Sequence, residues 1–392
     1  MFQLDEEQRL ILQSVREIVQ KEIRPRAADL DETGQFPWET VRIFSKNDLL
    51  NPLLPRKYGG VEVSIYTFCM IVEEIAKACA SSALLLIAQA EGMLPIFYEA
   101  DESLKERYLS RLAGDSQTLT GLGAIDPSAG SGIFSLNTRA ELRGDQYLLQ
   151  GDKCYAKNGS VANFLVLYAH TDRSKGSHGI SAFVVEKGLS GLVFKRDENK
   201  MGMRGIIHSE ILLDNLSVPR KNLIGQEGEG FSNMLKTLSA SRLFTASQAV
   251  GLAQGAMDEA ISYARRRVQF GKTISHHAPI QFMIAEMAVG IESARLLTYQ
   301  TAFLFDQAEW KKAGTHAAMA KLIASDTAMK VTTDAVQIMG GYGYMKDYSA
   351  ERMMRDAKLT QFHMGTNQTM KLIIGREILG FINNEPRSEE FV

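Results

Sequence analysis

The sequence predicts an α+β protein in which helices come first, short strands follow, and long helices complete the chain. The first part has apolar residues at helical spacing, and residues 116 to about 217 show short β-type runs separated by turns. After Phe231 the sequence returns to long, alanine-rich helical stretches. Helices on both sides of a strand run indicate segregated layers rather than a doubly wound sheet. We therefore expect an all-helical domain at 1–115, a β domain at 116–232 and a helical bundle at 233–392.

The first helix is expected to begin just after Asp5, whose side chain suits an N-cap. Its apolar residues recur at helical spacing: Leu10, Ile11, Val15, Ile18 and Val19. Three further helical stretches are expected at Trp38–Asp48, Ser64–Ala100 and Leu104–Leu112. Within the longest of them we expect interruptions at Ser81-Ser82, Gly92 and Pro95.

The β domain is predicted from short, largely apolar runs. They are Tyr147–Gln150, Phe164–Tyr168, Ser181–Val185 and Glu210–Leu213. The glycine-rich segment Asn222–Gly230 is expected to be a loop that ends this domain. The closing helices are expected at Leu235–Val268, Ile280–Trp310 and His316–Met339, with two shorter helical stretches after Gly343.

Composition excludes several classes of protein. Of 392 residues, 45% are hydrophobic and 23% charged, which is the balance of a soluble globular protein. The net charge of −2 gives no reason to expect nucleic acid as a partner. The apolar run Ala83–Ala88 is too short for a membrane span, and Met1–Glu7 shows no signal-peptide pattern. The spacing of Cys69, Cys79 and Cys154 suits neither zinc nor a disulfide framework. We expect a cytoplasmic protein without a metal.

Six ordered segments carry a resemblance that covers essentially the whole chain. They are DPSAGSG (Asp126–Gly132), VPRKNLIGQEGEGF (Val218–Phe231), RRRVQFGKTI (Arg265–Ile274), QIMGGYGYMKDY (Gln337–Tyr348), ERMMRDAK (Glu351–Lys358) and MGTNQ (Met364–Gln368). In order and spacing they resemble the acyl-CoA dehydrogenase family. The resemblance implies an N-terminal helical domain, a middle β-barrel-like domain and a C-terminal four-helix bundle. It also implies bound FAD, an acyl-CoA substrate, a homotetramer built from two dimers, and an electron-transfer flavoprotein as electron acceptor.

The resemblance implies a set of FAD-contacting residues. They are Ser131, Tyr155, Lys157, Arg267, Phe270, Gln337, Gly340, Gly341, Thr366 and Gln368. A guanidinium such as that of Arg267 forms strong charge-assisted contacts with phosphate, and glycines permit close approach of backbone to a ligand. Gln337 and the two glycines match a segment that contacts FAD on the neighbouring subunit. Each motif also has an ordinary structural interpretation: a β-domain loop, a solvated helix face or a helix break.

Lys157 departs from the family pattern. It replaces the threonine or serine that hydrogen-bonds the edge of the flavin in relatives. A lysine ammonium that points inward would stabilise reduced, anionic flavin, whereas one that points into solvent would have no such effect.

The usual catalytic base is missing from both of its known places. Family dehydrogenases remove a proton with a glutamate, because a buried carboxylate can be tuned for this task. Met364 stands where most members carry that glutamate, and Ser241 stands at the alternative position before Arg242, which matches an arginine near the substrate end of the site. The chain is therefore an atypical member of the family it resembles.

Glu91 is the best candidate for a relocated acid/base. It lies in the apolar stretch Leu84–Leu94, where an ionisable side chain usually has a function. The same helix position carries a carboxylate in the glutaryl-CoA dehydrogenases and some alicyclic acyl-CoA dehydrogenases. The alternative is a glutamate at a helix edge facing water. His363 and His208 are weaker candidates, because neither has a visible partner in the sequence.

Three functions stay open from the sequence. The first is an FAD-dependent acyl-CoA dehydrogenase, or an enoyl-CoA reductase in reverse, with Glu91 as acid/base. A base away from the α-carbon suits an alicyclic α,β-unsaturated substrate such as cyclohex-1-ene-1-carboxyl-CoA, which would react by 1,4-elimination. The second is a flavin-containing acyl-CoA lyase similar to the desulfinases, which needs no α-proton base. The third is a non-catalytic FAD-binding homologue.

Overall fold

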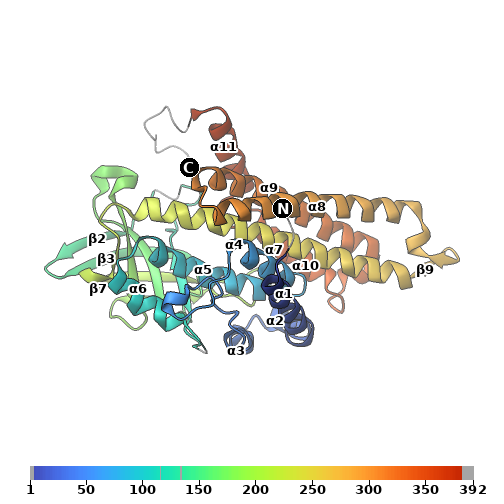
Figure 1. Ribbon diagram of the computed structural model, residues 1–392, viewed down its shortest axis with the longest axis horizontal. Helices are drawn as coiled ribbons and strands as arrows, with labels where there is room; N and C mark the ends of the chain where they lie inside the picture. The colour runs from blue at the N-terminus through green and yellow to red at the C-terminus, as the bar shows by residue number, and fades with distance from the viewer. Residues whose placement is uncertain (1–3, 115, 133–134, 382–392) are drawn as a thin grey trace.

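The helices and the strands occupy different parts of an elongated molecule. The structure is a computed structural model that describes residues 4–114, 116–132 and 135–381. In Figure 1 the sheet lies at one end, three long C-terminal helices extend to the other, and the first helices lie along one side. The fold is the α+β arrangement expected, with helical segments before and after a β domain.

The described residues of the N-terminal segment form six α-helices, joined in part by short π- and 3-10 helices. They are α1 (Glu6–Ile18), α2 (Ala27–Thr33), α3 (Trp38–Lys46), α4 (Ile65–Ala76), α5 (Ala80–Glu99) and α6 (Glu102–Leu109). The prediction that Asp5 caps the first helix is confirmed: its side chain accepts from the Gln8 amide at 2.7 Å, and the Gln8 side chain accepts in return from the Asp5 amide at 3.2 Å.

Helix α5 runs without a break through Ser81-Ser82, Gly92 and Pro95, so the interruptions predicted there are wrong. The chain instead breaks between α4 and α5, at residues 77–79. Pro95 is tolerated within the helix although it cannot donate the hydrogen bond that would reach the carbonyl of Glu91. Gly92 is required by packing, because a Cβ atom there would lie 2.4 Å from Thr120 Oγ1. Both breaker residues therefore serve the placement of α5 rather than its termination.

The apolar character of α5 reflects burial in this chain. By length and composition alone it is the one helix among the described residues that could cross a membrane, and 94% of the window concerned is buried inside the protein. A buried core helix satisfies the same test, so the feature is weak evidence for a membrane span.

The β domain is an eight-stranded sheet. Its strands are β1 (Thr120–Gly123), β2 (Arg139–Arg143), β3 (Gln146–Lys157), β4 (Phe164–His170), β5 (Ile180–Glu186), β6 (Leu192–Asp197), β7 (His208–Pro219) and β8 (Leu223–Ile224). The order is β6-β7-β3-β1-β4-β5-β8, and β2 pairs with β3 and β4. Neighbouring strands are antiparallel except where β4 meets β1 and β2. The sequence runs predicted β3, β4, β5 and β7 and missed the four shorter strands.

Five α-helices and a small hairpin make up most of the C-terminal part as far as residue 381. They are α7 (Gly230–Arg266), the hairpin β9 (Val268–Gln269) and β10 (Lys272–Thr273), α8 (Ala278–Asp306), α9 (Trp310–Met339), α10 (Ala350–Thr360) and α11 (Asn367–Ile378). Trp310 begins α9 rather than ending a helix, because the chain turns at 307–309 with Ala308 in the left-handed region at φ +56°. One hydrophobic core joins the N-terminal helices to this bundle, and a second fills the sheet.

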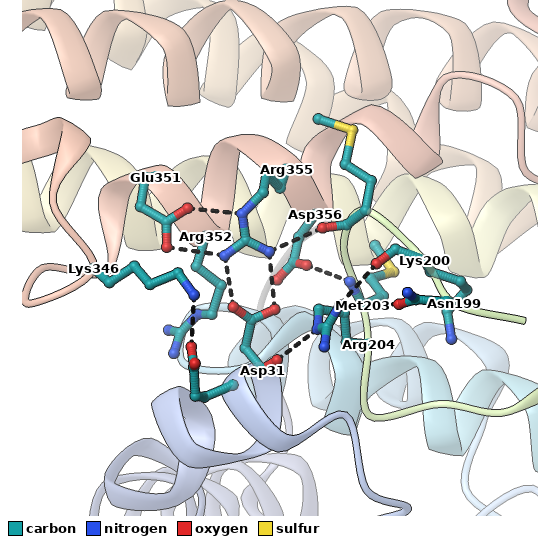
Figure 2. A network of polar contacts seen from close by, with 12 residues as sticks. Asp31, Asn199, Lys200, Met203, Arg204, Lys346, Glu351, Arg352, Arg355 and Asp356 are labelled. Carbon is teal, nitrogen blue, oxygen red and sulfur yellow. Dashed lines mark hydrogen bonds and ion pairs between the residues drawn. The ribbon is translucent and has the colours of Figure 1, made fainter.

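A charged network fastens the N-terminal helices to the C-terminal bundle and to the loop before β7. Figure 2 shows Arg355 of α10 at its centre. Its guanidinium donates to both carboxylate oxygens of Asp31 on α2, at 3.0 and 2.6 Å, and to the Met201 carbonyl at 2.9 Å. Glu351, one turn earlier on α10, holds the same guanidinium in place. The bidentate pair holds α10 against α2, and the Met201 contact holds the loop at residues 199–202, which lines a cavity.

Candidate active site

A cavity lies where the β domain meets the C-terminal helices. It has a volume of about 640 Å³ and is lined by strands β1, β3 and β7, helices α7 and α10, and the segment 362–369. Four residues predicted to contact FAD, namely Ser131, Tyr155, Lys157 and Thr366, line it, and so does Arg242. The structure therefore brings the substrate-end arginine together with this part of the predicted FAD site.

Packing of α5 against the sheet determines where Glu91 lies. Gly92 lets α5 approach Thr120 of β1 closely. Strand β1 pairs in turn with β3, where Leu122 stands opposite Lys157. Glu91, the residue before Gly92, is thereby placed next to the end of β3. The sequence alone gives no sign of this contact, because the two segments are more than 60 residues apart.

Glu91 is fully buried at 0% exposure, which excludes the alternative of a glutamate facing water. Its Oε1 accepts a hydrogen bond from the Ser241 hydroxyl, and its Oε2 forms an ion pair with the Lys157 ammonium. A carboxylate in apolar surroundings is held ionised by such partners. Lys157 and Ser241, which the sequence analysis considered separately from Glu91, therefore form one cluster with it.

Lys157 points inward, which settles the orientation that the sequence left open. An irregularity in the pairing of β3 with β7 between Lys153 and Ala156 exposes Tyr155 and buries Lys157. The ammonium lies 2.9 Å from His363 Nε2 and 3.9 Å from the Met364 sulfur. Burial lowers the pKa of Lys157, and the Glu91 carboxylate opposes that shift.

The segment that carries Met364 is held by two buried cations. Arg242 Nε donates to the Met364 carbonyl at 3.2 Å, and Lys321 Nζ donates to the Gly365 carbonyl at 2.8 Å. Burial lowers the pKa of Arg242 to about 10 and that of Lys321 to about 7. Met364 has φ +56°, an uncommon conformation for a residue with a side chain. The usual base position therefore adjoins the cluster, since the Met364 sulfur contacts Lys157.

A second buried ion pair organises the loop that carries Ser131. Asp126 accepts from the amides of Asn137 and Thr138 at 2.6 and 2.7 Å, and from Lys153 Nζ at 2.6 Å. These contacts occupy the carboxylate fully. Asp126 lines the cavity, but it stabilises the loop rather than offering a free acid or base.

The remaining predicted FAD contacts lie elsewhere in the chain. Arg267, Gly340 and Gly341 line a separate cavity of about 560 Å³ at the other end of the bundle, near the hairpin that begins with β9, which is labelled in Figure 1. Phe270 on that hairpin is 92% exposed. Gln337 and Gln368 are exposed and line neither cavity among the described residues. Within one chain the predicted FAD contacts at the two cavities do not come together. This separation is expected if each FAD is bound by residues of two subunits.

The groups at both cavities fit FAD. His208, which lines the larger cavity, has a buried Nδ1 with no hydrogen-bond partner among the described residues, and a bound polar group would satisfy it. The exposed ring of Tyr155 offers an aromatic face at the same cavity. At the smaller cavity the Arg267 guanidinium lies over the Tyr342 ring and is in none of the ion pairs of the described chain, so it is available to a phosphate.

Sequence patterns offered a signal for the roles of Lys321 and Ser241, but none for the contacts of His363. Lys321 is a lone cation in the alanine-rich stretch Ala317–Ala328, which is the pattern of a buried charge with a function. Ser241, treated only as an empty base position, holds Glu91. The partners of His363 are Lys157 and Thr245, which no local pattern connects to it. No group of three or more metal-ligating side chains occurs among the described residues.

Comparison with known proteins agrees with this geometry. Models of the acyl-CoA dehydrogenase N-terminal, middle and C-terminal domains match residues 5–115, 121–216 and 228–379. The chain is 55% identical over 379 residues to cyclohex-1-ene-1-carbonyl-CoA dehydrogenase of Geobacter metallireducens, covering 97% of this chain and 100% of the relative. It is 50% identical to the protein of the same name from Syntrophus aciditrophicus, covering 97% and 91%.

Solved structures give the same result. Butyryl-CoA dehydrogenase of Megasphaera elsdenii superposes with a TM-score of 0.93 at 35% identity, over 97% of this chain and 100% of that one. A chain solved in work on the electron transferring flavoprotein of Acidaminococcus fermentans gives a TM-score of 0.94 at 39% identity, over 97% and 99%. With its cavities, its buried acid and these relatives taken together, the chain belongs to the acyl-CoA dehydrogenase family of FAD-dependent oxidoreductases.

Proposed function

We propose that this enzyme oxidises an alicyclic, α,β-unsaturated acyl-CoA such as cyclohex-1-ene-1-carboxyl-CoA by 1,4-elimination, with Glu91 as the proton acceptor. The observation that carries the proposal is the position of Glu91. The Glu91 carboxylate contacts Ser241 directly, and it contacts Lys157, which in turn contacts the Met364 sulfur. It therefore lies close to positions 241 and 364, the two positions at which the resemblance would place a base. The two relatives at 50% identity or more bear the name of a dehydrogenase of this substrate.

The proton chemistry follows from where the carboxylate lies. Met364 has no exchangeable proton, so no base stands at the usual position on the segment 363–366. A carboxylate on α5 meets the substrate at a different carbon, and an unsaturated ring can lose a proton there because the double bond relays charge to the thioester carbonyl. The chemistry that FAD supplies when bound is acceptance of the hydride that leaves the second ring carbon.

Lys157 controls access to the base. It lines the cavity, whereas Glu91 lies behind it and is fully buried. A substrate ring therefore has to displace the Lys157 ammonium before a ring carbon reaches the carboxylate. The flexible stem of lysine allows such a movement, and catalytic contacts often tighten only once the substrate is bound.

Arg242 is the residue that orients the acyl end. It is buried at the cavity wall and takes part in none of the ion pairs of the described residues. Its Nε is used by the Met364 carbonyl. The other guanidinium nitrogens are available to a carbonyl or an anionic group of a ligand.

A homotetramer and an electron-transfer flavoprotein complete the proposal. Along α8, large exposed apolar side chains recur every seven residues. They are Phe282 (66% exposed), Val289 (68%), Leu296 (51%) and Phe303 (41%). A regular apolar stripe on an otherwise finished bundle favours packing against a second copy. The similarity to a chain studied with an electron transferring flavoprotein supports that kind of acceptor.

Anaerobic bleaching of the flavin absorbance tests the proposed substrate. The purified holoenzyme is mixed with cyclohex-1-ene-1-carboxyl-CoA and, separately, with butyryl-CoA. We expect bleaching by the cyclic thioester and at least tenfold slower bleaching by butyryl-CoA. Bleaching by butyryl-CoA alone would refute the substrate. Product formation without any electron acceptor would instead establish the lyase, and a colourless protein that releases no FAD on heating would establish the non-catalytic homologue.

A further inference from the structure

The cluster around Glu91 contains a chain of hydrogen bonds that leads away from the base. Lys157 lies between the Glu91 carboxylate and His363 Nε2, which is 2.9 Å from the ammonium. The second ring nitrogen of His363, Nδ1, lies 3.1 Å from the hydroxyl oxygen of Thr245. That hydroxyl donates to the carbonyl of Ser241 at 2.9 Å.

The directions of these hydrogen bonds determine the tautomer of His363. A lysine ammonium can only donate, so Nε2 of the neighbouring imidazole has to accept. The proton of the neutral ring then lies on Nδ1, from which it is donated to Thr245 Oγ1. Thr245 can accept it because its own hydrogen goes to the Ser241 carbonyl. Every donor in this series of hydrogen bonds therefore meets an acceptor. The Nε2 lone pair of His363 faces the Lys157 ammonium.

From this geometry we infer that Lys157 and His363 form a relay that returns Glu91 to its ionised state after each proton capture. The inference rests on the proposed role of Glu91 as base. When the substrate C–H bond breaks, the proton forms an O–H bond on Glu91. Lys157 then gives one Nζ proton to His363 Nε2 and takes the proton from Glu91, so Lys157 is unchanged and Glu91 is a carboxylate again.

The last member of the relay is the one that can release the proton. Glu91 is fully buried and does not line the cavity, whereas His363 does. The groups that face His363 are Lys157 from β3, His208 from β7 and Lys321 from α9. Burial, followed by the nearby cations, lowers the pKa of His363 well below its ordinary value. The imidazolium becomes neutral again when its Nε2 proton passes to water in the cavity that His363 and Lys157 both line, while the Nδ1 proton stays on the hydrogen bond to Thr245.

The substitution His363→Gln tests the relay. Glutamine keeps an oxygen that accepts from Lys157 but cannot take up a proton. We expect the first-turnover rate of flavin reduction to fall less than about threefold, because Glu91 begins ionised, while steady-state turnover with an artificial one-electron acceptor falls at least tenfold. In His363→Ala, added imidazole should restore at least one third of the lost turnover.

The matched control is Lys153→Met. Lys153 lies on the same strand as Lys157 and is equally buried in an ion pair with Asp126, but it does not touch the relay. We expect Lys153→Met to lower the melting temperature without separating first-turnover from steady-state rates. Equal falls of both rates in His363→Gln, or turnover within twofold of wild type, would overturn the relay.

Failure of the relay can be told from failure of the proposed base. If Glu91→Gln reduces flavin as fast as wild type, Glu91 is not the base and the relay falls with it. If Glu91→Gln loses reduction but His363→Gln shows no difference between the two rates, only the relay is wrong. Lys157→Met tests the base rather than the relay: it should slow both rates at least tenfold, because the Glu91 carboxylate loses its positive partner.

Discussion

Replacement of Glu91 by glutamine separates the chemical role of this residue from its structural role. Glutamine has nearly the same volume and shape, so it leaves the packing of α5 on β1 in place. Its amide oxygen can accept from Lys157, and its NH₂ can donate to Ser241 Oγ, because a hydroxyl is both donor and acceptor. What the substitution removes is the ability to take up a proton.

The expected magnitudes follow from these contacts. A positioned general base contributes about 10²- to 10⁴-fold to a rate, or about 3–5 kcal/mol of transition-state stabilisation. The stability cost is smaller, because Lys157 keeps His363 as an acceptor and burial already lowers the pKa of Lys157. Loss of a charge-assisted hydrogen bond at such a site costs about 1–3 kcal/mol.

Stopped-flow measurement of flavin reduction, together with thermal unfolding, checks both numbers. Glu73→Gln is the matched control: Glu73 is also buried, on the neighbouring helix α4, and is ion-paired with Arg295 at 3.0 Å outside the cavity. It should lose stability without losing the rate of flavin reduction. A Glu91→Gln rate within threefold of wild type, in a protein that still binds FAD, would refute the assignment of the base.

Three further substitutions test the surrounding structure. Arg355→Lys cannot reproduce the two parallel bonds to Asp31, and we expect chemical denaturation to show a loss of about 1–3 kcal/mol. Burial lowers the pKa of Lys321 from 10.5 in the unfolded chain to about 7 in the folded protein, so the unfolded chain binds more protons between these two values. The free energy of unfolding should therefore rise with pH across that range, and it should rise less in Lys321→Met. Val289→Glu places a charge in the exposed stripe of α8 and should shift the assembly to smaller species in light scattering.

The order of elements could be predicted from the sequence because it depends on local patterns. Apolar residues at helical spacing and short apolar runs are visible within one window of the chain. Short strands such as β1 and β8 were missed because two to four residues carry no periodicity. The breaks predicted at Gly92 and Pro95 were wrong because tertiary packing overrides helix propensity. At Gly92 that packing, the close approach to Thr120, is also what fixes the site.

The chemistry of the site depended on contacts between distant segments. Glu91 was singled out because a lone acid in an apolar helix is visible in the sequence. Its partners were not, since Lys157 and Ser241 lie 66 and 150 residues further along the chain. Lys157 was predicted to contact the flavin only because it matches a flavin-contacting position in the family that the sequence resembles. The structure adds that its ammonium pairs with Glu91, which no single motif could indicate.

The residues at positions 91, 157, 241 and 364 depend on one another. A glutamate on α5 alone would be a buried acid without a counter-ion, which is costly enough to favour its neutral form. Lysine at 157 supplies the counter-ion, serine at 241 supplies a hydrogen bond, and methionine at 364 removes a carboxylate that would otherwise compete for the same ammonium. A glutamate placed at position 364 alone would therefore bring two carboxylates around Lys157. Like charges at one site oppose joint ionisation, so a carboxylate at 364 would compete with Glu91 for the one ammonium.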